Sequence, residues 1–269
     1  MTVSETIGSI HAIRRALSAV RGRPSGVSLF LGGSVLLTAS ALCAAPGTLD
    51  PTFGTGGLVT TTVGVNLSGG AQARFVHVRA DGSLVVAGYA KVGIVNNNNS
   101  DFAAVRYLAN GTIDTTFGAS GITLIPVSAG SDDLGLAGAV QPDGKIILIG
   151  HAPDAGNIRN FAAMRLNVDG TLDETFGSSG RVLVSIGGVE DTGWAVALQP
   201  DGKILLAGET MDFSSLGTAL VRLNADGTLD TSFGIGGTLK TPGRGGKFAP
   251  AYAIKVQGDG KIIVAGWSQ

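Results

Sequence analysis

Residues 222–234 read R-L-N-A-D-G-T-L-D-T-S-F-G, and the core of this stretch, G-T-[LI]-D-x-[TS]-F-G, occurs four times in the chain. The copies are separated by 64, 59 and 57 residues and span Gly47–Gly54, Gly111–Gly118, Gly170–Gly177 and Gly227–Gly234. A second phrase, D-G-[KS]-[IL]-[ILV]-[LV]-[AI]-G, alternates with the first and begins at Asp81, Asp143, Asp201 and Asp259. Two phrases in strict alternation indicate one supersecondary unit that is repeated about four times.

The third interval shows which strands one unit contains. Residues 195–199 and 204–207 are short apolar runs, and the Pro200-Asp201-Gly202-Lys203 turn between them predicts a hairpin. Residues 219–223 predict a third strand and residues 238–241 a more polar fourth strand. The hairpin runs are apolar without alternation, which predicts strands that are buried on both faces.

Four short antiparallel strands in ~58 residues, without helical periodicity, are typical of a β-propeller blade. The sequence therefore predicts an all-β fold, a β-propeller of about four four-stranded blades. The count is fifteen strands, from a fourth strand near Leu58 to a hairpin that ends at Gly266. Either one blade has three strands or the ring is incomplete in a truncated chain, and we favour truncation.

The composition is that of a globular protein with many tight turns. The chain has 269 residues, is 44% hydrophobic and 14% charged, carries a net charge of −1, and contains 43 glycines. The near-neutral charge lacks the basic footprint of a nucleic-acid-binding protein, so no nucleic-acid partner is expected. Arg244-Gly245-Gly246-Lys247 is a basic loop too small to form such a surface.

The first 45 residues differ in kind from the rest. Arginines at 14, 15, 21 and 23 precede an acid-free apolar run over residues 27–42, which is followed by Ala44 and Ala45. This order predicts a signal peptide at 1–45, cleaved after Ala41 or Ala45, and a propeller repeat domain at 46–269 without a membrane span. The expected location is secreted, periplasmic or cell surface, and an uncleaved membrane anchor is the alternative. Cys43 is the only cysteine, which excludes internal disulfides and cysteine metal sites.

The phrases Q-P-D-G-K-I-[IL]-L-[AI]-G and R-L-N-x-D-G-T-L-D-x-[TS]-F-G resemble those of the delta-60 repeat family, a bacterial group of predicted β-propellers. The resemblance covers Gly47 to Gly266 and recurs four times. It implies an exported or surface-associated bacterial protein, and it implies no established activity and no catalytic residues. The chain departs from the pattern where Asn110 replaces the aspartate before Gly111 and where Arg79-Ala80 replaces Gln-Pro.

The repeated turn offers a candidate calcium loop, which we weigh against a structural role. Asn224, Asp226, Gly227 and Asp230 occupy positions 3, 5, 6 and 9 of the pattern D-x-D-x-D-G-x-x-D, but Arg222 stands at the first position, where an anion is needed. We therefore predict an ion pair across the turn in each of three units, at Arg106/Asp114, Arg165/Asp173 and Arg222/Asp230. The phenylalanines of the same phrase are predicted to fill the space between blades, at Phe53, Phe117, Phe176 and Phe233.

Other chemistries have weaker support in the sequence. His11 lies in the leader, His77 and His151 occupy different repeat positions, and no G-x-S-x-G elbow accompanies them. Acid pairs at Asp132-Asp133 and Glu190-Asp191 could serve glycoside chemistry, but solvated loop ends are the favoured interpretation, since adjacent side chains on a strand point apart. The insertion Asn96-Asn97-Asn98-Asn99, between a second and a third strand, is either a ligand-facing loop or a tolerated surface insertion.

Two classes of function remain. The favoured one is an exported, non-catalytic β-propeller module for binding or scaffolding, with a protein or carbohydrate surface as its ligand. The alternative is an exported propeller enzyme, a hydrolase or lyase acting on polysaccharide. We assign no catalytic, cofactor-binding or metal-ligating residue and expect no cofactor, because the polar residues that recur are explained by turns.

Overall fold

The computed structural model describes residues 47–64, 70–92, 99–128, 130–211, 216–242 and 249–267. The leader with His11 and Cys43, the asparagines at 96–98 and the basic loop at 244–247 lie outside the described residues. Within those ranges, no helix has the length and apolar character needed to cross a membrane.

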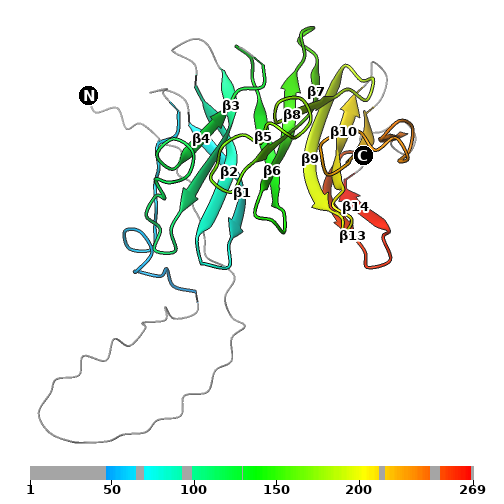
Figure 1. Cartoon of the computed structure of the whole chain (residues 1–269). Coiled ribbons are helices and arrows are strands. Elements are labelled where there is room, and N and C mark those ends of the chain that lie inside the picture. The colour runs from blue at the N-terminus through cyan, green and yellow to red at the C-terminus, as the bar shows by residue number, and fades with distance from the viewer. Residues whose placement is uncertain are drawn as a thin grey trace, which may run out of the picture.

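The described chain forms a four-stranded sheet, an eight-stranded sheet made of two four-stranded antiparallel units, and a final hairpin (Figure 1). The first blade contains β1 (Ala71–Val78), β2 (Leu84–Lys91), β3 (Ser100–Tyr107) and β4 (Ile122–Ile125). The second contains β5 (Leu134–Val140), β6 (Ile146–Pro153), β7 (Arg159–Leu166) and β8 (Arg181–Val184). The third contains β9 (Glu190–Leu198), β10 (Ile204–Met211), β11 (Leu216–Leu223) and β12 (Thr238–Pro242). The hairpin contains β13 (Ala251–Val256) and β14 (Ile262–Gly266).

These units follow one another in a row of blades, with the first blade and the final hairpin at opposite ends (Figure 1). A single parallel pairing, between Arg159 of β7 and Glu190 of β9, links the second blade to the third. The all-β propeller architecture predicted from the repeats is therefore confirmed, as three complete blades and one hairpin.

The predicted strand near Leu58 is wrong, and the described residues contain fourteen strands rather than fifteen. Leu58 forms only an isolated bridge with Thr55, the same bridge that opens the fourth strand of each complete blade. No described third strand precedes it, so this segment has no ladder to join. It covers the first blade instead: Val63 is buried, and the Tyr107 hydroxyl donates to Thr61 Oγ1 at 2.7 Å.

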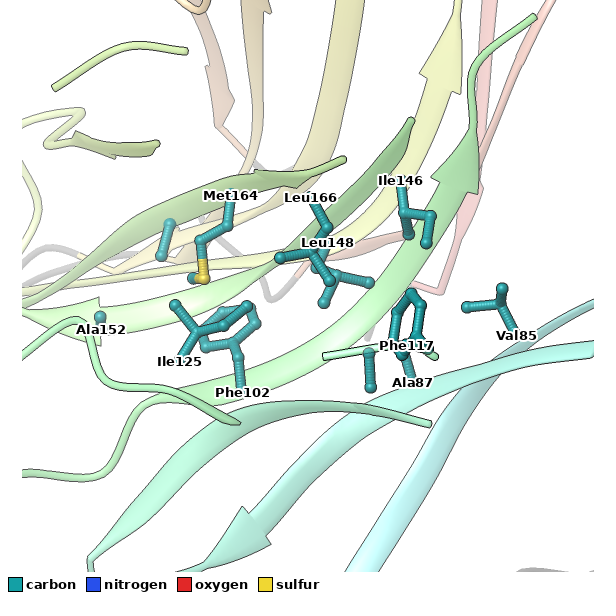
Figure 2. Packing of buried hydrophobic residues seen from close by; sticks show 12 residues of the cluster. Val85, Ala87, Phe102, Phe117, Ile125, Ile146, Leu148, Ala152, Met164 and Leu166 are labelled. Atoms are coloured by element: carbon teal, nitrogen blue, oxygen red, sulfur yellow. The ribbon is translucent and has the colours of Figure 1, made fainter. Parts of the chain in front are cut away.

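The second strand of each complete blade is buried on both faces, as its continuous apolar run predicts. In β6, Ile146 and Leu148 face the first blade, where they pack with Phe102 and Val85 (Figure 2). The alternate residues, Ile147 and Ile149, belong to a separate core against the third blade. Each blade thus covers apolar faces that its neighbours cannot cover alone.

The phenylalanine of the repeated turn fills the interface between blades, as predicted. Phe117 lies fully buried between the first two blades, with its ring against Gly170 of the next turn, and Phe176 has the same place one blade later. Backbone hydrogen bonds join the same turns, since Gly118 N–H donates to Asp169 O at 2.7 Å and Gly177 N–H to Asp226 O at 2.7 Å. The phrase that marks the end of one blade therefore also holds the next blade.

Candidate functional site

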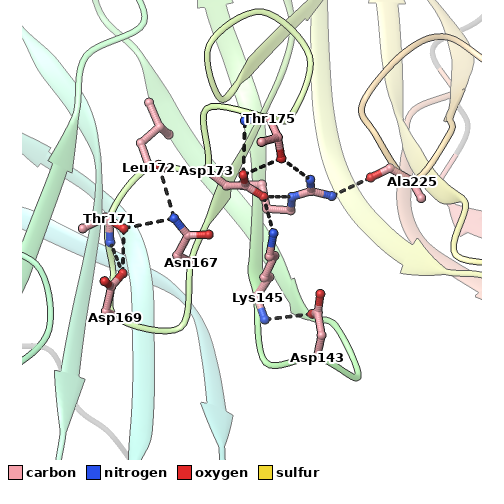
Figure 3. A network of polar contacts seen from close by, with 10 residues as sticks. Asp143, Lys145, Asn167, Asp169, Thr171, Leu172, Asp173, Thr175 and Ala225 are labelled. Carbon is pink, nitrogen blue, oxygen red and sulfur yellow. Dashed lines mark hydrogen bonds and ion pairs between the residues drawn. The ribbon is translucent and has the colours of Figure 1, made fainter.

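The predicted ion pair forms in all three units that carry both residues. Arg165 Nε lies 2.6 Å from Asp173 Oδ2, and its guanidinium sits 4.6 Å from the centre of the Phe176 ring. Figure 3 shows Asp173 with its partners Thr175 and Lys145. Arg165 also donates through Nη1 to the carbonyl of Ala225 in the following blade. The equivalent Nε–Oδ2 distances are 2.7 Å for Arg106/Asp114 and 2.7 Å for Arg222/Asp230. We call this arrangement the clasp.

Both carboxylate oxygens of the clasp aspartate already accept hydrogen bonds. Asp173 Oδ1 accepts from the backbone and hydroxyl of Thr175, while Oδ2 accepts from Arg165 and from Lys145 Nζ at 2.7 Å. Burial opposes ionisation, but hydrogen bonds from Lys145, Thr175 and Arg165 hold the pKa of Asp173 well below its usual range. The turn is therefore built for cationic side chains, which supports the structural role over a calcium loop.

The solvated-end interpretation of the acid pairs is wrong for one member of each pair. Asp133 and Asp191 are fully buried, although Asp132 is exposed and Glu190 is partly exposed. The connection from the preceding blade folds over the start of the strand: Val127 and Ser128 donate their backbone N–H to Asp133 Oδ2 at 2.7 and 2.8 Å. Burial, reinforced by the nearby Asp101, raises the pKa of Asp133 to about 6. These two carboxyls seal blade junctions and cannot touch a polysaccharide.

We expect Asp133→Asn to stabilise the fold above pH 6 by about 2–3 kcal/mol, because the folded protein then no longer holds a buried charge. The pKa of Asp133 is higher in the folded protein than in the unfolded chain, so protonation of this carboxyl stabilises the fold at low pH. That stabilisation is lost as pH rises through about 6. Urea unfolding at pH 5 and pH 8 measures the change. The increase in unfolding free energy caused by Asp133→Asn should be smaller at pH 5 than at pH 8. The control Asp132→Asn, at an exposed position, should leave the unfolding free energy unchanged at both pH values. An equal effect of Asp133→Asn at both pH values would contradict this account.

The two described histidines do not come together. His77 lies on β1, stacked 6.4 Å from the Phe75 ring, whereas His151 lies on β6 in the next blade. Burial, with the positive charge of Arg159, lowers the pKa of His151 to about 4, so this imidazole is neutral at neutral pH. In the described part of the chain, no group of three histidine, cysteine or acidic side chains is placed to hold a metal ion.

A feature that the sequence analysis missed is a β-bulge in the first strand of every unit. The register shifts by one residue in β1, β5, β9 and β13 alike, and the bulged residues are Arg74, Leu136, Trp194 and Tyr252. Opposite each bulge stands the final glycine of the second repeated phrase, the one that begins D-G-[KS]. These glycines are Gly88, Gly150, Gly208 and Gly266. A Cβ on Gly208 would collide with the carbonyl oxygen of Thr192, and the other three glycines meet the equivalent carbonyl. The repeated glycine was therefore the available signal for the bulge.

In three of the four units, the residue that follows this glycine lies beside the bulged residue. In chain order the four residues are Tyr89, His151, Glu209 and Trp267. The Arg74 guanidinium lies 5.9 Å from the centre of the Tyr89 ring, and Trp267 Nε1 donates to the Tyr252 hydroxyl at 3.3 Å. The turns repeat from blade to blade, but this pair of side chains differs in every unit. Because bulges re-aim side chains and often adjoin functional sites, we take the row of bulges as the candidate site.

Three aromatic side chains gather at the end of this row, and we call Trp194, Tyr252 and Trp267 the aromatic cluster. The Trp194 and Tyr252 rings are 5.5 Å apart and inclined at 68°. Tyr252 and Trp267 each expose 45% of their surface, while Trp194 is half-buried. Trp194 and Tyr252 come from β9 and β13, and Trp267 directly follows β14, so the cluster spans the junction between the third blade and the final hairpin.

Glu209 of β10 lies near Trp194, one member of the aromatic cluster. Burial raises the pKa of Glu209, the Trp194 indole N–H opposes this shift, and the negative charge of Glu190 adds to it. Glu209 Oε2 and Trp194 Nε1 are both buried and have no hydrogen-bond partner among the described residues. The polar group of the aromatic cluster that lies near this carboxyl is therefore the Trp194 indole N–H.

Comparison with known proteins gives a match to three of the repeats. A family model described as "Domain of unknown function (DUF5122) beta-propeller" matches residues 79–117, 141–176 and 199–233. Each match begins at the first hairpin turn of a blade and ends at or beside the clasp phenylalanine. The search of curated proteins found no match.

Among solved structures, "Crystal structure of a thermostable family-43 glycoside hydrolase" matches with a TM-score of 0.37 and 14% sequence identity. That alignment covers 73% of this chain and 64% of the other chain. The family match supports a family of propeller repeats, while the delta-60 resemblance stays a prediction. With three matched repeats and three four-stranded blades, the chain is a β-propeller repeat protein.

Proposed function

We propose that this protein is an exported, non-catalytic β-propeller module that binds carbohydrate through the aromatic cluster. The observation that carries the proposal is the meeting of Trp194, Tyr252 and Trp267, with two of the three rings substantially exposed. Aromatic rings present flat apolar faces with a polar edge, which suits the apolar faces and hydroxyl rims of sugar rings. Export rests on the predicted signal peptide at residues 1–45.

The enzymatic alternative, a polysaccharide hydrolase or lyase, has one observation in its favour. Glu209 has a raised pKa beside a partly exposed aromatic surface, as a general acid requires. Glycoside hydrolysis needs a second carboxyl across the scissile bond, and the acidic group whose charge acts on Glu209 is Glu190. Glu190 is already paired with Arg159 at 3.4 Å, which favours the binding module.

The test is binding to a panel of immobilised glycans, followed by calorimetry on those that bind. Trp194→Ala and Tyr252→Ala are each expected to weaken binding about fivefold, since stacking on one ring contributes on the order of 1 kcal/mol. The matched control is Ile235→Ala, whose side chain is 89% exposed near the clasp at the other end of the third blade. Unchanged affinity in both aromatic variants would reject the proposal. Release of reducing ends that Glu209→Gln abolishes would support the enzyme instead.

A further inference from the structure

Asn110 differs in chemistry from the residues at its position in the second and third blades. Asp169 and Asp226 stand at this position, and each precedes a glycine and a threonine, as Asn110 does. Asn110 is the only asparagine in the chain that is followed by glycine, and both Asn110 and Thr112 are exposed to solvent. In such a pair the backbone nitrogen of the glycine can attack the side-chain amide, because glycine has no Cβ to obstruct the approach.

The turn places two hydrogen-bond donors on the oxygen that this attack would charge. Thr112 donates to Asn110 Oδ1 through its backbone N–H at 3.0 Å and through its hydroxyl at 2.7 Å. When a nitrogen adds to the amide carbon, negative charge develops on Oδ1, and donors already in place stabilise that charge. The hydrogen bond from Gly111 N–H to Leu108 O, at 2.9 Å, must open before the attack. The turn thus activates the amide, while this hydrogen bond keeps the reaction slow.

The aspartate that the reaction yields already fits this turn. Asp169 accepts from the backbone N–H and the hydroxyl of Thr171 at 2.9 and 2.7 Å, the contacts that Asn110 makes with Thr112 (Figure 3). These hydrogen bonds lower the pKa of Asp169, so the turn favours the charged carboxylate.

An isoaspartate would not fit the turn in the same way. Its main chain runs through the former side chain, and the carbonyl of Asn110 becomes part of a free carboxylate. In the folded protein that carbonyl accepts from Gly54 N–H at 2.8 Å, a contact that joins the first repeated turn to the first blade. The structure therefore distinguishes the two products of the reaction.

We propose that Asn110 is a site of spontaneous deamidation in the folded protein, promoted by the two donors of Thr112. Gly111 N forms a bond to Asn110 Cγ, and its proton leaves with the amide nitrogen as ammonia, so that a cyclic imide remains. Water then opens the imide at either carbonyl and gives aspartate or isoaspartate. The sum consumes water and releases ammonia, without an oxidant or a reductant. At neutral pH the new carboxylate adds a negative charge to the turn.

The test is incubation of the full chain at pH 8, followed by peptide mapping with mass spectrometry. Replacement of the amide by a carboxyl raises the mass of the peptide that contains Asn110, and enzymatic methylation of isoaspartate distinguishes the two products. We expect this gain at Asn110 and none at Asn167 or Asn224, which precede valine and alanine in the equivalent turns.

Thr112→Val should slow the reaction about fivefold, since one hydrogen bond of ~1 kcal/mol is lost. The matched control is Thr171→Val, which makes the same change in the second blade and should leave the rate at Asn110 unchanged. Asn110→Asp reproduces the aspartate product and should keep the melting temperature of the wild type. No gain in mass at Asn110, or an equal rate in wild type and Thr112→Val, would overturn the proposal.

The ratio of the two products keeps the proposal testable if Thr112→Val does not fold. In urea, the unfolded chain should yield mainly isoaspartate, because water attacks the imide carbonyl beside the α-carbon. The folded protein should yield mainly aspartate, which the turn accommodates. The same ratio in both conditions would overturn the proposal, since it would show that the reaction passes through the unfolded chain.

Discussion

Gly208→Ala should unfold the third blade or destabilise the protein by about 3 kcal/mol or more. The new Cβ would overlap the carbonyl oxygen of Thr192 and approach Gly193 Cα to 3.0 Å, and both contacts are with backbone in a hydrogen-bonded sheet. Backbone atoms cannot rotate away as a side chain can, so the bulge at Trp194 must slip or open. A slip by one residue would turn the buried face of β9 outward, because side chains alternate between the faces of a strand.

Thermal unfolding followed by circular dichroism measures this effect, with Gly258→Ala as the control. A Cβ on Gly258 would meet no atom within 4 Å, and this glycine has no positive φ, so its replacement should leave the melting temperature nearly unchanged. At temperatures where Gly208→Ala is still folded, we expect weaker glycan binding, because the bulge directs Trp194 toward Tyr252. A melting temperature equal to that of the wild type would show that the bulge does not require glycine.

Asp173→Asn is the second substitution with a large expected effect. It should lower the free energy of unfolding by roughly 3–5 kcal/mol at pH 7. The variant leaves Arg165, whose side chain is only 9% exposed, without its anion and removes the partner of Lys145. Asp114→Asn is the matched comparison. Its pair with Arg106 is somewhat more exposed, and Ser83 stands where the second blade has Lys145, so the loss should be smaller.

The clasp also makes the stability of the fold depend on pH. Because the folded pKa of Asp173 is depressed, its contribution is present above the unfolded value of ~4 and is lost as pH falls below it. The difference in unfolding free energy between wild type and Asp173→Asn should therefore shrink from pH 7 to pH 3, which urea titrations measure. A calcium-dependent rise in melting temperature that Asp230→Asn abolishes would instead favour the cation-loop interpretation of the same turn.

How much the sequence could predict depends on the range of the interactions involved. The clasp was predictable because Arg165 and Asp173 are eight residues apart across one turn, and turn geometry brings the equivalent residues together in each of the three complete blades. The apolar run of β6 likewise predicted burial on both faces without knowledge of its neighbours. The strand near Leu58 was mispredicted because a strand needs a partner, and the pattern of one segment does not show whether its partner exists.

The burial of Asp133 and the aromatic cluster were decided by tertiary structure. Asp133 is sealed by backbone N–H groups of Val127 and Ser128, whose direction depends on how the connection between blades folds back. Trp194 and Tyr252 are 58 residues apart and meet only because successive blades stack with their bulges aligned.

By itself, then, the sequence determined the repeating unit, its turns, its strands that are buried on both faces, and its clasp. Each of these depends on contacts within a few residues or on a pattern repeated in every blade. Only the tertiary structure decided which varied residues share a surface, because that depends on the stacking of blades and on a bulge that no single strand pattern reveals.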